Sequence, residues 1–118
     1  MRVLIAEDEP IIGGAIADQM EALGCEVLGV VRDSASGRRL IETGHPDVLL
    51  LDVDLEDGPT GPLLADRSLC GEADVLFLTA REQVELEEGT EPRDILTKPF
   101  TPRELERWVN GVRSRRVA

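Results

Sequence analysis

The sequence is poor in several residue types that common binding sites require. It has no tyrosine, two phenylalanines and one tryptophan, so it offers few of the aromatic side chains on which single-stranded nucleic acids stack. Cys25, Cys70 and His45, the only residues of their kinds, do not stand at metal-ligand spacing, which argues against a zinc site. We find no apolar run long enough to span a membrane and no secretory signal pattern. We therefore expect a cytoplasmic protein whose thiols are reduced.

Basic residues are scarce relative to acidic ones. The 118 residues include 24 Asp and Glu but only 13 Lys and Arg, which gives a formal net charge of -11. Because a negative charge of this size repels phosphate groups, we expect no binding to nucleic acid or to a membrane surface. The charge is compatible with a cation site and with basic protein partners. Lys98 is the only lysine in the chain.

The residues that are present predict one α/β domain. A chain of 118 residues suits a single domain, and its short apolar segments alternate with helical patterns. The run Val48–Leu51 contains no polar residue, which indicates a strand buried on both faces. We expect strands at residues 2–6, 26–31, 48–51, 75–78 and 95–96. Together these patterns predict a parallel sheet with helices on both faces.

Five helical segments are predicted from apolar spacing and from start and stop residues, at 10–23, 34–43, 62–69, 81–88 and 102–112. The second is capped by Asp33 or Ser34. The fourth is expected to be short or irregular, because glutamates crowd between residues 82 and 91. The last begins with a capping box formed by Thr101 and Glu104. We expect the arginines that follow it, at 113, 115 and 116, to form a frayed basic end.

Polar side chains stand at the ends of four predicted strands. Glu7 and Asp8 follow the first strand, Asp52 the third, Thr79 the fourth and Lys98 the fifth. Ligands of parallel sheets bind outside the carboxyl ends of the strands, so we expect these side chains to converge. Carboxylates about 4 Å apart repel by roughly 4 kcal/mol per pair at an effective dielectric of about 20. Either their pKa values rise or a cation neutralises them, and Mg²⁺ suits oxygen ligands best.

At these positions the sequence resembles the receiver domain of two-component response regulators. The resemblance covers nearly the whole chain and rests on segments 7–8, 49–52, 77–80 and 98–100, with Gly58 or Gly61 after the third strand. It implies a flavodoxin-like, doubly wound sheet of five parallel strands in the order 2-1-3-4-5. Residues 1–118 would form one receiver domain. Because the sequence ends soon after the last helix, we expect a stand-alone receiver.

The resemblance also assigns roles to the residues at the strand ends. Asp52 would be the phosphoacceptor, Lys98 would pair with the phosphoryl group, and the Thr79 hydroxyl would move toward it. The bond between Lys98 and Pro99 would be cis. Mg²⁺ would be bound by Asp8 and Asp52, by Glu7 through water and by the backbone carbonyl of Asp54.

Two departures from the family bear on switching and on phosphoryl lifetime. The aromatic switch residue that receivers usually carry three positions before the lysine is replaced here by Ile95, which alters its coupling to Thr79. Asp54 and Arg81 stand two residues after Asp52 and Thr79. The resemblance places both beside the phosphoryl group, and we hypothesise that their charges pair and tune its hydrolysis.

The resemblance further implies a signalling domain rather than an enzyme that turns over an external substrate. Its phosphoryl donor would be a sensor histidine kinase or a histidine phosphotransfer protein. Its output would be partner binding or service as a phosphate sink. An effector or a second copy could bind the face formed by residues 81–88, 95–96 and 102–112.

Three alternatives remain open at this point. The segment Asp52-Val53-Asp54 also resembles the Asp-x-Asp motif of haloacid-dehalogenase-type phosphohydrolases, although there the motif normally follows the first strand. A flavodoxin-like cofactor carrier would need a phosphate loop where acidic residues 7–9 stand. A degenerate receiver would act by protein contacts alone, without phosphorylation.

Overall fold

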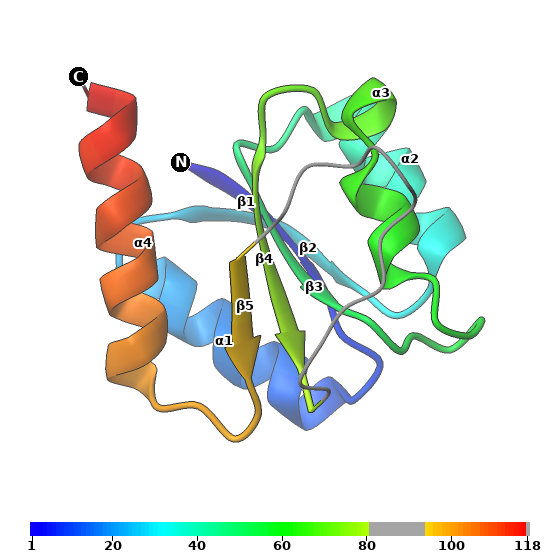
Figure 1. The fold of residues 1–118 in the computed structure, drawn as a ribbon, viewed down its shortest axis with the longest axis horizontal. Helices are drawn as coiled ribbons and strands as arrows, with labels where there is room; N and C mark the ends of the chain where they lie inside the picture. Colours follow the sequence, from blue (N-terminus) through cyan, green and yellow to red (C-terminus); the bar gives the residue numbers. More distant parts are fainter. Residues whose placement is uncertain (81–93, 118) are drawn as a thin grey trace.

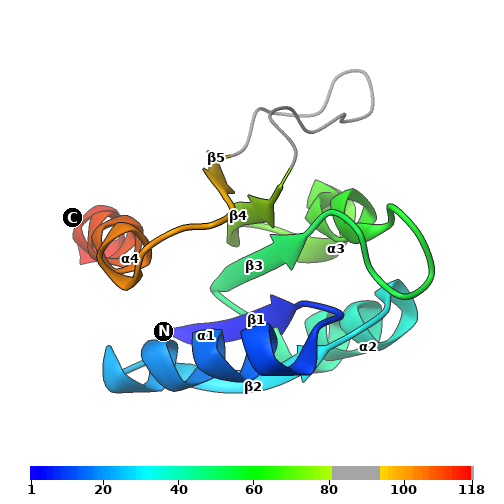
Figure 2. The ribbon, with the colours of Figure 1, turned by 90° about the horizontal axis from the view of Figure 1, so that it is seen from below.

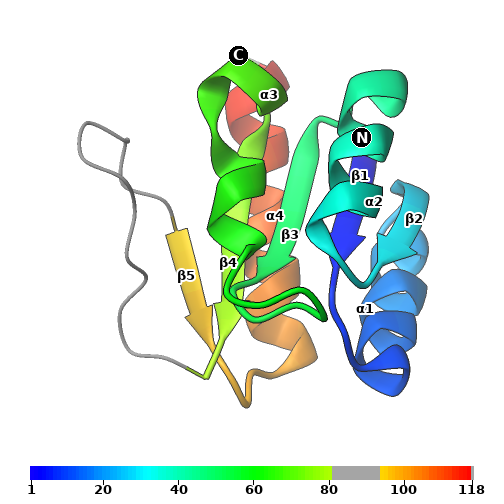
Figure 3. The same ribbon diagram turned by 90° about the vertical axis from the view of Figure 1, so that its right-hand side faces the viewer.

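In a computed structural model that describes residues 1–80 and 94–117, the chain forms a five-stranded parallel sheet with helices on both faces (Figure 1). The strands are β1 (Arg2–Ala6), β2 (Glu26–Val31), β3 (Val48–Asp52), β4 (Asp74–Thr79) and β5 (Asp94–Thr97). Their spatial order is β2-β1-β3-β4-β5, which confirms the predicted topology. Figure 3 shows that all five strands run toward the same end of the sheet.

The helices form one layer on each face of the sheet. They are α1 (Pro10–Ala22), α2 (Ser34–Gly44), the 3-10 helix η1 (Gly61–Ala65), α3 (Arg67–Cys70) and α4 (Pro102–Val117). Helices α1 and α4 cover one face, whereas α2, η1 and α3 cover the other (Figure 2). The predicted fourth helical segment, 81–88, lies outside the described residues. None of the described helices combines the length and the apolar character needed to cross a membrane.

The apolar run of β3 is explained by burial on both faces. Leu49 and Leu51 pack in the core beneath α2 and η1, whereas Val48 and Leu50 pack beneath α1 and α4. Successive side chains of a strand point to opposite faces, so a strand covered on both sides has no position for a polar residue. All five residues of β3 are buried, and only the last, Asp52, is charged.

The predicted single helix over 62–69 is wrong, because the structure has two short helices in its place. Asp66 interrupts them with an extended backbone at φ -62° and ψ 126°. Its side chain accepts a hydrogen bond from Ser68 N at 3.0 Å and thereby caps a new helix instead of continuing the old one. The caps predicted elsewhere are confirmed: Asp33 accepts from Ser36 N at 2.7 Å, and Glu104 N donates to Thr101 Oγ1 at 3.2 Å.

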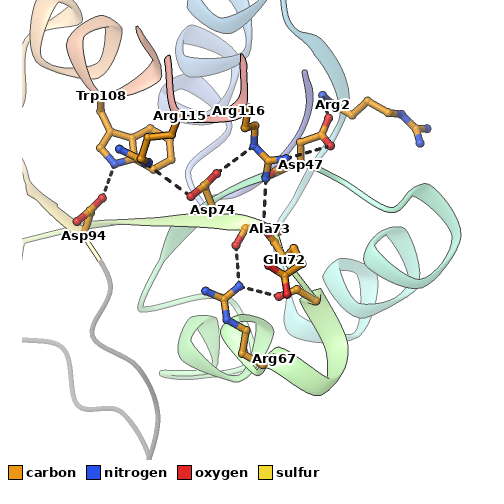
Figure 4. A network of polar contacts seen from close by, with 11 residues as sticks. Arg2, Asp47, Arg67, Glu72, Ala73, Asp74, Asp94, Trp108, Arg115 and Arg116 are labelled. Atoms are coloured by element: carbon orange, nitrogen blue, oxygen red, sulfur yellow. Dashed lines mark hydrogen bonds and ion pairs between the residues drawn. The ribbon is translucent and has the colours of Figure 1, made fainter. Parts of the chain in front are cut away.

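The arginines near the end of α4 do not fray, contrary to expectation. Arg116 Nε lies 3.0 Å from Asp74 Oδ2, and its Nη2 donates to the carbonyl oxygens of Asp47 at 2.7 Å and Glu72 at 3.2 Å (Figure 4). These contacts tie the last turn of α4 to the amino-terminal ends of β3 and β4. In the first half of α4, Trp108 Nε1 donates to Asp94 Oδ2 at 2.8 Å, which links the helix to the start of β5 (Figure 4).

Candidate functional site

Three acidic side chains converge at the carboxyl end of the sheet, as predicted. One oxygen each from Glu7, Asp8 and Asp52 lie within 4.8 Å of one another. This proximity follows from the strand order, because β1 and β3 are neighbours and both end at the same edge. Glu7 is fully buried, Asp52 is 7% exposed and Asp8 is partly exposed, so the cluster extends from the interior to the surface.

Lys98 follows the edge strand β5 and reaches this cluster past the end of β4. Its Nζ lies 2.9 Å from Glu7 Oε2 and 3.0 Å from Asp52 Oδ2. Lys98 N donates to Thr79 O at 2.8 Å, which extends the pairing of β4 and β5 by one residue and fixes the start of the side chain. The bond from Lys98 to Pro99 is cis, as the resemblance implied.

Burial and charge act together on the ionisable groups of the cluster. Burial raises the pKa of Glu7 from 4.5 to about 7; the charge of Asp52 acts in the same direction, and the hydrogen bond from Lys98 opposes it. Burial acts to lower the pKa of Lys98, but its hydrogen bonds to Glu7 and Asp52 outweigh that effect and raise it. Lys98 therefore keeps its charge at neutral pH. Even with Glu7 about half protonated at pH 7, the negative charge of the three carboxyl groups exceeds the positive charge of one ammonium, so the cluster retains the capacity to bind a divalent cation.

The backbone around Asp52 is held by close contacts within the following loop. Asp54 N donates to Asp52 Oδ1 at 3.2 Å, and Gly61 N donates to Val53 O at 3.0 Å. A Cβ atom on Gly61 would lie 1.9 Å from Asp52 O, so only glycine permits this approach of two backbone segments. Of the two glycines that the sequence left open, Gly61 is therefore the one that packs against the site.

The remaining predicted site residues lie around this centre at different distances along the strands. In the register of β3 and β4, Asp52 pairs with Leu78, so Thr79 stands one residue beyond it. Thr79 is buried, with 1% of its surface exposed. Ile95 pairs with Phe77 rather than with Thr79, and it is 39% exposed on the edge strand β5.

The side chain of Asp54 is exposed at the edge of the site. Arg81, its hypothesised partner, lies outside the described residues. The acidic stretch 82–91 of the expected docking face also lies outside them.

Two features of the site were missed by the sequence analysis. The first is the contact between Lys98 and Glu7, which the combination of a single lysine and a strand-end glutamate could have indicated. The second is the set of hydrogen bonds made by Asp57 in the loop after Asp52. The bond from Ser34 could not be predicted from a local sequence pattern, because Ser34 lies 23 residues away from Asp57.

Nearly the whole chain is similar to known proteins. The family model of the response regulator receiver domain matches residues 3–110. The chain is 35% identical over 103 residues to the phyllosphere-induced regulator PhyR of Methylorubrum extorquens, a match that covers 85% of this chain and 39% of that protein. It is 33% identical over 124 residues to the swarming motility regulation protein RssB of Serratia marcescens, covering 100% of this chain and 55% of that protein.

Solved structures agree with these sequence matches. The PhyR response regulator REC domain of Erythrobacter litoralis matches with a TM-score of 0.81 and 28% identity, over 94% of this chain and 88% of that one. The signal receiver domain of a modulated diguanylate cyclase from Desulfovibrio desulfuricans matches with a TM-score of 0.79 and 29% identity, over 94% and 91%. The chain thus spans nearly all of these isolated domains but only about half, or less, of the length of the curated relatives.

Proposed function

The chain belongs to the family of response regulator receiver domains, and from this premise we propose that it accepts a phosphoryl group on Asp52. The donor would be a sensor histidine kinase or a histidine phosphotransfer protein, and residues 1–118 would act as one receiver domain. The observation that carries the proposal is the placement of Asp52 at the end of a buried strand, 3.0 Å from the Lys98 ammonium and within the carboxylate cluster.

Mg²⁺ is the cation that we propose for the cluster. The donors of Glu7, Asp8 and Asp52 are all carboxylate oxygens, which suit a hard divalent cation and offer nothing to a metal that prefers sulfur or nitrogen. The backbone carbonyl of Asp54 would be a further ligand. Mg²⁺ held there would supply positive charge against both the carboxylates and the oxygens of an incoming phosphoryl group.

In the proposed transfer, a carboxylate oxygen of Asp52 attacks the phosphorus of a phosphohistidine. A P–O bond forms as the P–N bond breaks, and the electron pair of that bond stays on the imidazole, whose ring takes up a proton. The Lys98 ammonium would exchange its contacts with Glu7 and Asp52 for a phosphoryl oxygen. The Thr79 hydroxyl would bind a second oxygen, so that charge on the transferred group is matched by fixed donors.

The acyl phosphate would end by hydrolysis, and we propose that Asp54 and Arg81 set its lifetime. The signal would pass to a partner protein, or the domain would drain phosphoryl groups from a shared kinase. Ile95 has no aromatic ring and cannot act as an aromatic switch. We therefore expect a movement of Thr79 to be transmitted by the residues that contact Thr79. The domain would work in the cytoplasm and would promote only its own phosphorylation and dephosphorylation.

A test compares a phosphorus–nitrogen donor with a phosphate ester. Phosphoramidate and Mg²⁺ should label the protein stoichiometrically, whereas p-nitrophenyl phosphate should not be turned over. Continuous turnover of the ester would instead favour the aspartyl-nucleophile phosphohydrolase, although Asp52 ends β3 and not the first strand as in that class. Absence of labelling by any donor would favour a degenerate receiver that acts by protein contacts.

A further inference from the structure

Asp57, in the loop between β3 and η1, contacts the residues at which two helices begin. Its carboxylate accepts hydrogen bonds from Ser34 N at 3.1 and 3.2 Å and from Ser34 Oγ. It also accepts from Thr60 Oγ1 at 2.6 Å. Ser34 is the first residue of α2, and Thr60 immediately precedes η1. Asp57 therefore links the start of one helix to the start of the next.

The contact with Thr60 leads directly to Asp52. Thr60 is followed by Gly61, whose backbone packs so closely on the Asp52 carbonyl that a Cβ atom would lie 1.9 Å from its oxygen. Gly61 N also donates to Val53 O at 3.0 Å. With no free space between these backbone segments, a displacement of Thr60 is transmitted through Gly61 to the carboxyl end of β3.

The first half of the same loop is anchored separately. Leu55 is buried in the core with 5% of its surface exposed. Glu56 N donates to Arg32 O at 2.8 Å, and Glu56 Oε1 lies 2.7 Å from Arg32 Nη2. These contacts hold the loop to the turn between β2 and α2 at one point, while Asp57 holds its second half. The two anchors use different side chains, so removing the Asp57 carboxylate removes no atom of the contacts between Glu56 and Arg32.

We propose that Asp57 is a positioning residue for phosphoryl transfer: acting through Thr60 and Gly61, it holds Asp52 in the geometry that transfer requires. The inference rests on the proposed function. It does not make Asp57 a metal ligand, since the acidic cluster consists of Glu7, Asp8 and Asp52.

A carboxylate is required at this position because all partners of Asp57 are donors. Both oxygens of aspartate accept hydrogen bonds, whereas asparagine offers one acceptor and directs two N–H donors toward donors. The variant Asp57→Asn keeps the shape of the side chain but loses part of the junction. Thr60→Val removes the hydroxyl while keeping the volume of the threonine. Asp18→Asn makes the same change of charge on the exposed surface of α1 and is the matched control.

The experiment measures the rate of Asp52 labelling by phosphoramidate at saturating Mg²⁺, together with the denaturant midpoint of each variant. We expect Asp57→Asn to slow labelling about tenfold, within the roughly 10²-fold that a misplacement of about 1 Å can cost. Thr60→Val should slow it similarly, and the double variant should be no slower than either single one. Asp18→Asn should stay within about twofold of wild type, as expected for a surface change away from the site.

A second readout does not depend on phosphorylation. Asp54 N donates to Asp52 Oδ1, so hydrogen exchange at this amide reports on the local geometry of Asp52 in the unmodified protein. Exchange should accelerate in Asp57→Asn and not in Asp18→Asn. Labelling of Asp57→Asn at the wild-type rate overturns the inference, even if its denaturant midpoint falls. If wild type is not labelled at all, the proposed function fails instead, and the exchange rates alone decide whether Asp57 positions Asp52.

Discussion

The Nζ atom of Lys98 lies 3.0 Å from Oδ2 of Asp52, across the end of the strand that separates them. The two residues are 46 positions apart in sequence, and each is fixed by its own strand. The contact places a compact positive charge beside the carboxylate that we propose to be phosphorylated. Because the same ammonium also binds Glu7, Lys98 partly neutralises the pocket that a cation would occupy.

Removal of Lys98 should therefore affect metal binding and phosphoryl transfer in opposite directions. In Lys98→Met the carboxylates lose their ammonium partner, so we expect Mg²⁺ to bind several-fold more tightly, measured by titration calorimetry. Labelling of Asp52 should be slower by about 10²-fold, as when one fixed donor to a transition state is removed. Arg103→Met, which removes an exposed positive charge at the start of α4, should leave both quantities unchanged. Weaker Mg²⁺ binding in Lys98→Met would contradict this account.

Gly61→Ala should destabilise the protein, because the new Cβ would overlap the Asp52 carbonyl and the backbone would have to move. We expect a loss of at least about 1–3 kcal/mol in the free energy of unfolding, typical of overpacking. Gly14→Ala is the matched control, since its Cβ would meet nothing within 4 Å on α1. It should stabilise the helix by up to about 1 kcal/mol. Equal effects of the two substitutions in urea unfolding would refute the close approach at Gly61.

Arg116→Ala should cost about 1 kcal/mol of stability, because the Arg116 side chain, 32% exposed, binds two backbone carbonyls as well as Asp74. Arg115→Ala is the comparison: its side chain is 59% exposed, and its one contact with Asp74 is at 3.6 Å. A pair of this kind contributes little, so this variant should unfold close to wild type. If both variants lose the same stability, Arg116 does not hold the end of α4 in the way described.

The junction at Asp57 predicts a particular dependence of stability on pH. The pKa of Asp57 lies below its usual 3.8 because Ser34 and Thr60 donate to the carboxylate. A carboxyl group whose pKa is lower in the folded state stabilises that state above the unfolded value. This contribution is lost as the pH falls from about 3.8 through the lower, folded value. The free energy of unfolding of wild type, measured in urea, should therefore fall more between pH 5 and pH 3 than that of Asp57→Asn. Parallel pH dependences of the two proteins would count against the junction.

Sequence reasoning predicted the sheet and the cluster because both depend on local patterns. A strand buried on both faces must be apolar, and the charged residues that end such strands must meet where the strands end. The break at Asp66 was not predicted, since the apolar spacing continues across it and only the side-chain cap on Ser68 separates the two helices.

Contacts between distant segments were beyond the reach of the same reasoning. Gly58 and Gly61 cannot be distinguished by residue type. Only the close contact between the backbones of Gly61 and Asp52 shows which of the two glycines packs against the site. In the sequence, Arg116 belongs to a basic segment that is expected to fray. In the structure it binds backbone carbonyls next to the starts of β3 and β4. The partners of Asp57 are set by the packing of α2 against the loop, which no spacing along the chain encodes.

The most direct test of the central claim is to locate the phosphoryl group. The protein is incubated with phosphoramidate and Mg²⁺, the acyl phosphate is trapped by reduction with borohydride, and the modified peptide is sequenced by mass spectrometry. We expect modification at Asp52 alone, its loss when Mg²⁺ is chelated, and no labelling of Asp52→Asn under conditions in which Asp18→Asn is labelled like wild type. Modification at another residue, or labelling of Asp52→Asn at the wild-type rate, would contradict the account.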